Sequence, residues 1–99
     1  MPDLPVVFSE KKYIIFKSHD GYIVMNKDMD GFAHTHIENE RTARWIVSLS
    51  NTKKLPRDMK RYLLVSLLRV NDDETYCRKI GELIENKRKK QTYFNRSCA

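Results

Sequence analysis

The chain has 99 residues, enough for one small domain with a modest core and too few to enclose a deep cleft. Its formal net charge of +6 is unevenly placed: residues 1–50 hold six Lys or Arg against seven Asp or Glu, whereas residues 51–99 hold thirteen against six. Such asymmetry favours a polyanionic or acidic partner, although a basic segment also serves solubility. We expect a single domain over 1–99, with 1–10 an extended lead-in and 91–99 a loosely ordered tail.

Several protein classes are disfavoured by the same composition. No apolar run approaches the roughly 20 residues that cross a bilayer, and the N-terminus carries acid before its short apolar patch, the reverse of a secretory signal. Cys77 and Cys98 show no CxxC spacing, which argues against a disulfide framework or a zinc knuckle. We therefore expect a cytoplasmic protein without a membrane partner.

The N-terminal part predicts a three-stranded antiparallel meander. Runs rich in β-branched and aromatic residues span 11–17, 22–26 and 32–37, and Asp-Gly dipeptides at 20–21 and 30–31 separate them as hairpin turns. Residues 6–8 pack on the domain or add an edge strand. Two-residue turns would pair Phe16 with Met25 and Met25 with His36, and we expect their face to meet the helices. That face holds Ile14, Phe16, Ile23, Met25, Phe32, His34 and His36, and a one-residue change in either turn would exchange the two faces.

Three helices are predicted at 39–51, 56–70 and 73–89, which makes the fold α+β, with the meander packed against the three helices. Asn39 is a good cap for the first helix, whose inner stripe Trp45 and Leu49 widen. The second helix holds the longest apolar run, with Pro56 in its first turn and Met59 in its buried stripe.

The third helix carries two local signals. Asn71 and Glu74 have the spacing of a capping box at its start. Gly81 lies within it, at a cost of about 1 kcal/mol relative to alanine unless close packing requires a glycine there.

Two oxygen- and nitrogen-rich patterns suggest metals, and neither is complete. His34 and His36 point to one side of a strand, as in some zinc sites, yet no further ligand has a compelling spacing; the candidates are His19, Asp28, Asp30 and Glu38. The stretch from Asn26 to Gly31 imitates half a calcium loop, but its twelfth position is Ile37 in place of a bidentate Glu. We expect no metal and no cofactor.

Catalytic motifs are also missing from the sequence. It has no GxSxG, no glycine-rich phosphate loop and no cysteine with an evident histidine partner. We expect a protein that is not an enzyme and has no small-molecule substrate, and a metal-dependent hydrolase built on His34 and His36 ranks last among the hypotheses.

Basic residues gather at two places in the second half of the chain. A helix-turn-helix is a poor match, because the third helix opens with Asp72, Asp73 and Glu74 where a recognition helix meets phosphates. The candidate binding residues are therefore Lys53, Lys54, Arg57, Lys60, Arg61, Lys87, Arg88, Lys89 and Lys90. Helical spacing would place Arg57, Lys60 and Arg61 on one exposed face.

These residues support two hypotheses. The first is a small regulatory protein that contacts the backbone of nucleic acid, or a nucleic-acid-handling complex, through its basic half. The second is an inhibitor or adaptor that recognises an acidic protein surface through charge and exposed apolar residues. The chain has a general resemblance to short proteins of phages and mobile elements, and no motif assigns it to a family.

Overall fold

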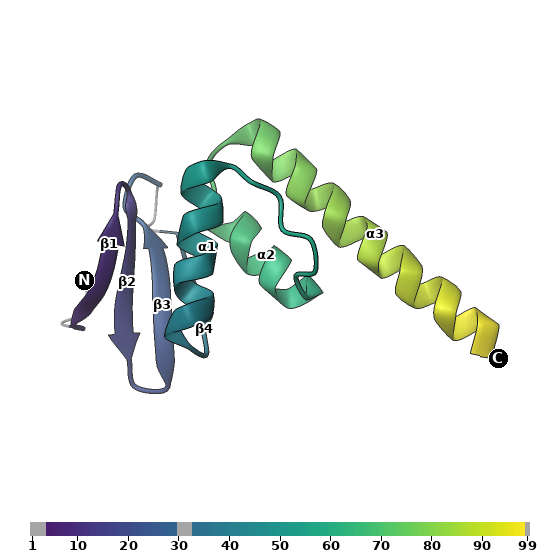
Figure 1. Cartoon of the computed structure of the whole chain (residues 1–99), viewed down its shortest axis with the longest axis horizontal. Coiled ribbons are helices and arrows are strands. Elements are labelled where there is room, and N and C mark those ends of the chain that lie inside the picture. The colour runs from purple at the N-terminus through teal and green to yellow at the C-terminus, as the bar shows by residue number, and fades with distance from the viewer. Residues whose placement is uncertain (1–3, 30–32, 99) are drawn as a thin grey trace.

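The computed structural model describes residues 4–29 and 33–98, with the backbone alone described from 88 onward. Its strands are β1 (Val6–Glu10), β2 (Tyr13–Ser18), β3 (Gly21–Asn26) and β4 (His34–Ile37), and its helices are α1 (Glu40–Thr52), α2 (Arg61–Arg69) and α3 (Glu74–Cys98). One face of the sheet meets α1 and α2, and α3 crosses α2 and runs away from the sheet (Figure 1). The predicted α+β class is confirmed.

The sheet has four antiparallel strands in the order β1-β2-β3-β4, so the prediction of three strands was wrong. β1 pairs with β2 through the two-residue turn Lys11-Lys12, with a register shift between Val6 and Phe8. This turn could not be recognised in the sequence, because Lys11 has a φ of 56°, a conformation for which glycine is the usual residue. The shift directs Phe8 toward the helices, where the Arg44 guanidinium lies 4.2 Å from its ring centroid.

The turn between β2 and β3 lies one residue earlier than predicted. Ser18 pairs with Gly21, so the loop is His19-Asp20 and Phe16 pairs with Ile23. Gly21 is needed for a different reason than turn geometry: a Cβ there would lie 2.7 Å from the Ile37 carbonyl oxygen of β4. The next hairpin pairs Met25 with His34, and its loop, which includes the second Asp-Gly at 30–31, extends outside the described residues.

The buried sheet face was also predicted wrongly. The residues that face the helices are Tyr13, Ile15, Val24, Thr35 and Ile37, all of them buried. The described residues of the predicted face lie on the outer one, where His34 and His36 are exposed, although Phe16 and Met25 are buried beside their cross-strand partners Ile23 and Ile14. Phe32, also predicted for that face, lies outside the described residues. In both hairpins the strand pairing differs from the predicted pairing by two residues. A shift of two keeps every residue on the same face of the sheet, so only the prediction of which face meets the helices was wrong.

The first helix follows its local signals, and the second does not. Asn39 caps α1 by accepting a hydrogen bond from the Thr42 backbone N–H at 2.9 Å, as predicted. Leu49 is buried there, whereas Trp45 is 40% exposed and does not widen the inner stripe. α2 begins at Arg61 and not at Pro56. The segment before it is not helical, and Pro56 and Met59 are buried within that segment.

The predicted capping box at the start of α3 is replaced by another arrangement. Asp73 caps the helix, accepting from the Tyr76 backbone N–H at 2.8 Å. Asn71 instead turns into the core, where its amide donates to the Ser50 hydroxyl at 2.9 Å and to the Leu67 carbonyl at 2.8 Å. The helix continues to Cys98, past the predicted end at 89. The expected looseness of 91–99 stays a prediction.

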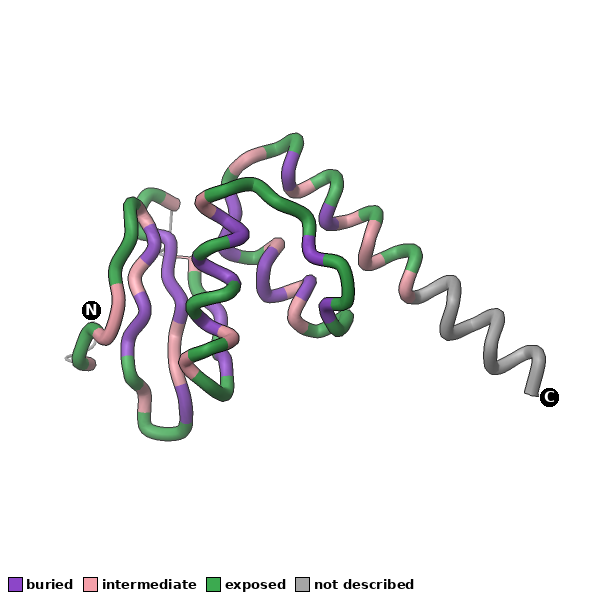
Figure 2. The backbone as a smooth tube through the Cα atoms, viewed as in Figure 1, coloured by how far each residue is buried: buried purple, intermediate pink, exposed green. Residues whose placement is uncertain are grey.

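Buried positions concentrate where the sheet, α1 and α2 meet, as the tube in Figure 2 shows. At this junction Asn71 also accepts hydrogen bonds from the Tyr13 hydroxyl and the Lys53 ammonium, each at 3.3 Å. A second buried amide, Asn26, donates to the Val70 carbonyl at 2.9 Å and ties the end of β3 to the end of α2. Two amides thus fix the corner between α2 and α3 against the sheet.

We expect Asn71→Ala to lower the free energy of unfolding by about 3 kcal/mol, because it leaves buried donors and acceptors without partners. Urea unfolding measures the change. Asn51→Ala removes a surface amide that bonds Glu10 and should cost less than about 1 kcal/mol. Equal losses in the two variants would contradict a special role for Asn71.

Gly81 offers a second test, because an added Cβ would have no described heavy atom within 4 Å. Gly81→Ala should therefore stabilise the protein by about 1 kcal/mol through helix propensity alone. Thermal unfolding would record a higher Tm. A lower Tm would show that α3 needs the glycine for a close approach.

Candidate functional site

The connection between α1 and α2 presents a group of exposed cations. We call Lys54, Arg57, Lys60 and Arg61 the basic connection. Within the described part of the chain none of these four side chains makes an ion pair, and Asp58 is the one acid among residues 53–61. The backbone of the segment is held in place by α3, since the Tyr76 hydroxyl donates to the Lys54 carbonyl at 2.6 Å. The cations therefore stand on a fixed backbone and face water.

The start of α2 adds to the positive field of the basic connection. Lys60 occupies the N-cap position without a side-chain cap, and the first turn contains no acidic residue. The positive end of the helix dipole is consequently not compensated by a carboxylate within that turn, and the nearest acid in the sequence is Asp58, two residues before the N-cap. Only Arg61 of the predicted trio is helical, so Arg57 and Lys60 are exposed because of the extended connection and not because of helical spacing.

Lys53 differs from its neighbours. It ends α1 in the left-handed conformation with a φ of 60°, and its backbone N–H bonds the Leu49 carbonyl. Its ammonium bonds Asn71 and lies 5.4 Å from the centroid of the Tyr76 ring. Lys53 is therefore already engaged in the fold, unlike the residues of the basic connection.

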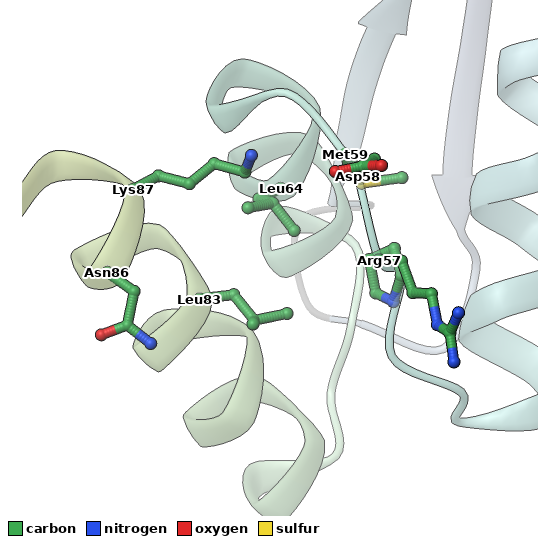
Figure 3. A pocket seen from close by; sticks show the side chains of 8 residues that line it. Arg57, Asp58, Met59, Leu64, Leu83, Asn86 and Lys87 are labelled. Carbon is green, nitrogen blue, oxygen red and sulfur yellow. The ribbon is translucent and has the colours of Figure 1, made fainter. Parts of the chain in front are cut away.

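One pocket is lined by a residue from each of the two predicted groups of basic residues. Lys87 of α3 and Arg57 of the connection line the same cavity, of about 420 Å³, although thirty positions separate them in the sequence. Figure 3 shows Lys87 extending across the opening toward Leu64, while the Arg57 guanidinium lies beyond the opposite wall. The side chains of Arg88, Lys89 and Lys90 lie outside the described residues.

The walls of this pocket, which we call the α2–α3 pocket, are largely aliphatic. Pro56, Met59, Leu64 and Leu83 form them, and Asp58 and Asn86 lie at the edge with the two cations. Its size falls within the range of about 300–1,000 Å³ that is usual for small-molecule sites. A mostly apolar cavity with a few polar groups at its mouth suits a ligand with an apolar body and a charged periphery.

A second cavity brings Lys53 together with two cations that were not among the candidate binding residues. Lys11, Lys12 and Lys53 line a space of about 320 Å³ with Asp28, Ser50 and Asn51. Two acids offset most of this charge, because Asp28 also lines the space and Asp72 pairs with Lys12. The adjacent Lys11-Lys12 pair was the only signal in the sequence. We do not assign this mixed cavity a ligand.

The histidines and the described cysteine do not gather into a metal centre. Among the described residues no group of three His, Cys, Asp or Glu side chains could hold an ion. His34 and His36 contact each other edge to face, with ring centroids 5.3 Å apart. The Cys77 thiol donates to the Asn71 carbonyl oxygen at 3.3 Å, and burial raises its pKa. Asp30, a predicted candidate ligand, and the Cys98 side chain lie outside the described residues.

One ion pair links the β1–β2 turn to the α2–α3 corner. The Lys12 ammonium lies 2.6 and 2.8 Å from the two carboxylate oxygens of Asp72 and holds the pKa of that carboxyl below its usual value of 3.8. Burial, helped by the charge of Asp72, raises the pKa of nearby Tyr13 to about 12, so its hydroxyl remains a donor to Asn71.

The chain matches no protein-family model, no curated protein and no solved structure. No helix in the described part of the chain is both long and apolar enough to span a membrane.

The Lys12–Asp72 pair should make stability depend on pH. The folded pKa of Asp72 is depressed, so its contribution is complete above the unfolded value of 3.8 and is lost as the pH falls through the folded value. Asp72→Asn should lower the free energy of unfolding by up to about 1 kcal/mol at neutral pH and have little effect in strong acid. Urea titrations at several pH values measure the difference between the two proteins. A difference that persists in strong acid would contradict the ion-pair explanation.

Proposed function

We propose that the protein binds the phosphate backbone of nucleic acid through the basic connection and Lys87. The observation that carries this proposal is the set of exposed cations without ion-pair partners among the described residues, gathered on one fixed segment. Phosphates favour such a surface because each contact releases condensed counterions. The start of α2, whose first turn has no acidic residue to offset the positive end of the helix dipole, supports the same ligand class.

A second candidate, an acidic protein partner, is favoured by apolar side chains close to the same surface. Leu55 is 45% exposed within the connection, and Tyr62 is 61% exposed in the first turn of α2. Large exposed side chains beside cations are typical of protein interfaces, in which Tyr and Arg are enriched. Neither residue carries charge, so their removal separates the two candidates: it weakens a protein complex strongly and backbone contact with duplex DNA little.

Salt dependence tests the first candidate. Five phosphate contacts, from Lys54, Arg57, Lys60, Arg61 and Lys87, predict that log K falls with log salt at a slope of about −4 on duplex DNA. Changing Arg57, Lys60 and Arg61 together to Gln should flatten that slope by about two to three units and weaken all sequences alike. Fluorescence anisotropy across a salt series gives both quantities.

A matched control removes three exposed cations elsewhere. Lys27, Arg41 and Arg78 lie on the β3–β4 loop, α1 and α3, and their triple change to Gln alters the net charge equally. The proposal requires the control to keep most of the slope. Equal losses would indicate a general charge effect, and an absence of wild-type binding at about 50 mM salt would reject nucleic acid as the ligand.

A further inference from the structure

The α2–α3 pocket has a shape and a lining that phosphate contacts alone do not use. Met59, Leu64 and Leu83 give it an aliphatic floor and walls. Lys87 extends across its opening, and the Arg57 guanidinium lies beyond the opposite wall (Figure 3). A phosphate group gains nothing from aliphatic walls, which would strip it of water without returning hydrogen bonds. The pocket therefore suits an uncharged, largely apolar group that belongs to an anionic ligand.

A nucleobase meets these requirements. Its two faces are apolar and polarisable, and the thioether of a methionine makes favourable contacts with aromatic rings. Met59 lines the pocket although it is almost wholly buried, so it supplies part of the wall that an entering ring would contact. The backbone phosphates on either side of the base would then lie near Lys87 and Arg57.

Asp58 distinguishes a base from the main competitor, an apolar side chain of an acidic peptide. It lies at the mouth of the pocket and makes no ion pair within the described part of the chain. Its carboxylate would repel the flanking acids of such a peptide, whereas it can accept a hydrogen bond from the exocyclic amino group of a base, as carboxylates do with cytosine. Thymine offers this carboxylate only its imino N–H, which is flanked by two carbonyl oxygens that repel a carboxylate, and it has no exocyclic amino group.

We propose that the α2–α3 pocket receives one unstacked base that carries an exocyclic amino group, so that the protein prefers single strands with such bases over duplex. This inference rests on the proposed function, because the basic connection must first hold the backbone. A duplex keeps its bases stacked and paired and cannot offer one to the pocket.

The experiment compares three labelled single strands of equal charge, together with a duplex, at one low salt concentration and slightly alkaline pH. The probes are oligo-dC and oligo-dT of about 16 nucleotides, an abasic strand of the same length, and a duplex. We expect oligo-dC to bind about tenfold tighter than the abasic strand and about fivefold tighter than oligo-dT. Leu83→Trp, which fills the pocket, should reduce oligo-dC binding to the abasic level and leave duplex binding unchanged.

Asp58→Ala gives a second signature that does not depend on filling the pocket. Loss of a carboxylate near the cations should tighten binding of the abasic strand and the duplex. The preference for oligo-dC over oligo-dT should disappear in the same variant. A purely electrostatic role for Asp58 would instead tighten all four probes equally and preserve their order, which contradicts the proposal.

The remaining outcomes separate the two proposals. If oligo-dC, oligo-dT and the abasic strand bind wild type equally with a steep salt slope, the base pocket is rejected and backbone binding stands. If no probe binds at low salt, the proposed function fails and the base pocket fails with it. Tight binding of a leucine-bearing acidic peptide that Leu83→Trp abolishes, with oligo-dC binding unaffected, would assign the pocket to a protein partner.

Discussion

The fold depends on one polar junction in an otherwise apolar core. Asn71 connects the Tyr13 hydroxyl of β2, the Ser50 hydroxyl of α1 and the Leu67 carbonyl of α2, and it does so at the point where the chain turns into α3. A buried amide stabilises only the arrangement in which all its partners are present, because each lost partner leaves a desolvated polar group. The junction therefore holds α2 against β2 and α1 at the point where the chain turns into α3.

Local signals predicted part of this structure and missed the rest for identifiable reasons. The Asn39 cap depends on neighbours within one turn and was predicted correctly. The sequence left open whether 6–8 would add an edge strand, and the turn that pairs them with β2 was not predicted because Lys11 takes a positive φ at a position where glycine would have marked it. Gly21 was predicted to form part of a turn. It is a glycine because a close carbonyl of β4 excludes a side chain there, and not because of turn geometry. Asn71 looked like a cap because the sequence does not show which polar residues enter the core.

The candidate site shows the same limit on a larger scale. The sequence identified Arg57, Lys60 and Arg61 as exposed cations, yet it assigned them to a helix that begins only at Arg61. Met59 is buried as the amphipathic pattern predicts, but the segment that carries it is not helical. That Arg57 and Lys87 line one pocket depends on how α3 crosses α2, a tertiary relation that no spacing within either segment encodes.

Charge in the described part of the chain is divided between structural and free groups. Asp72 pairs with Lys12 across the fold, Glu40 pairs with Arg44 along α1, and Lys53 is engaged by Asn71 and Tyr76. The basic connection is left without such partners, although like charges on one short segment repel one another over the Debye length of about 8 Å at physiological salt. Its backbone is held by Tyr76 and by the burial of Pro56 and Met59, and none of these contacts requires a positive side chain. The cations of the connection are thus not needed to build the fold, and a polyanionic ligand is the partner that would relieve their mutual repulsion.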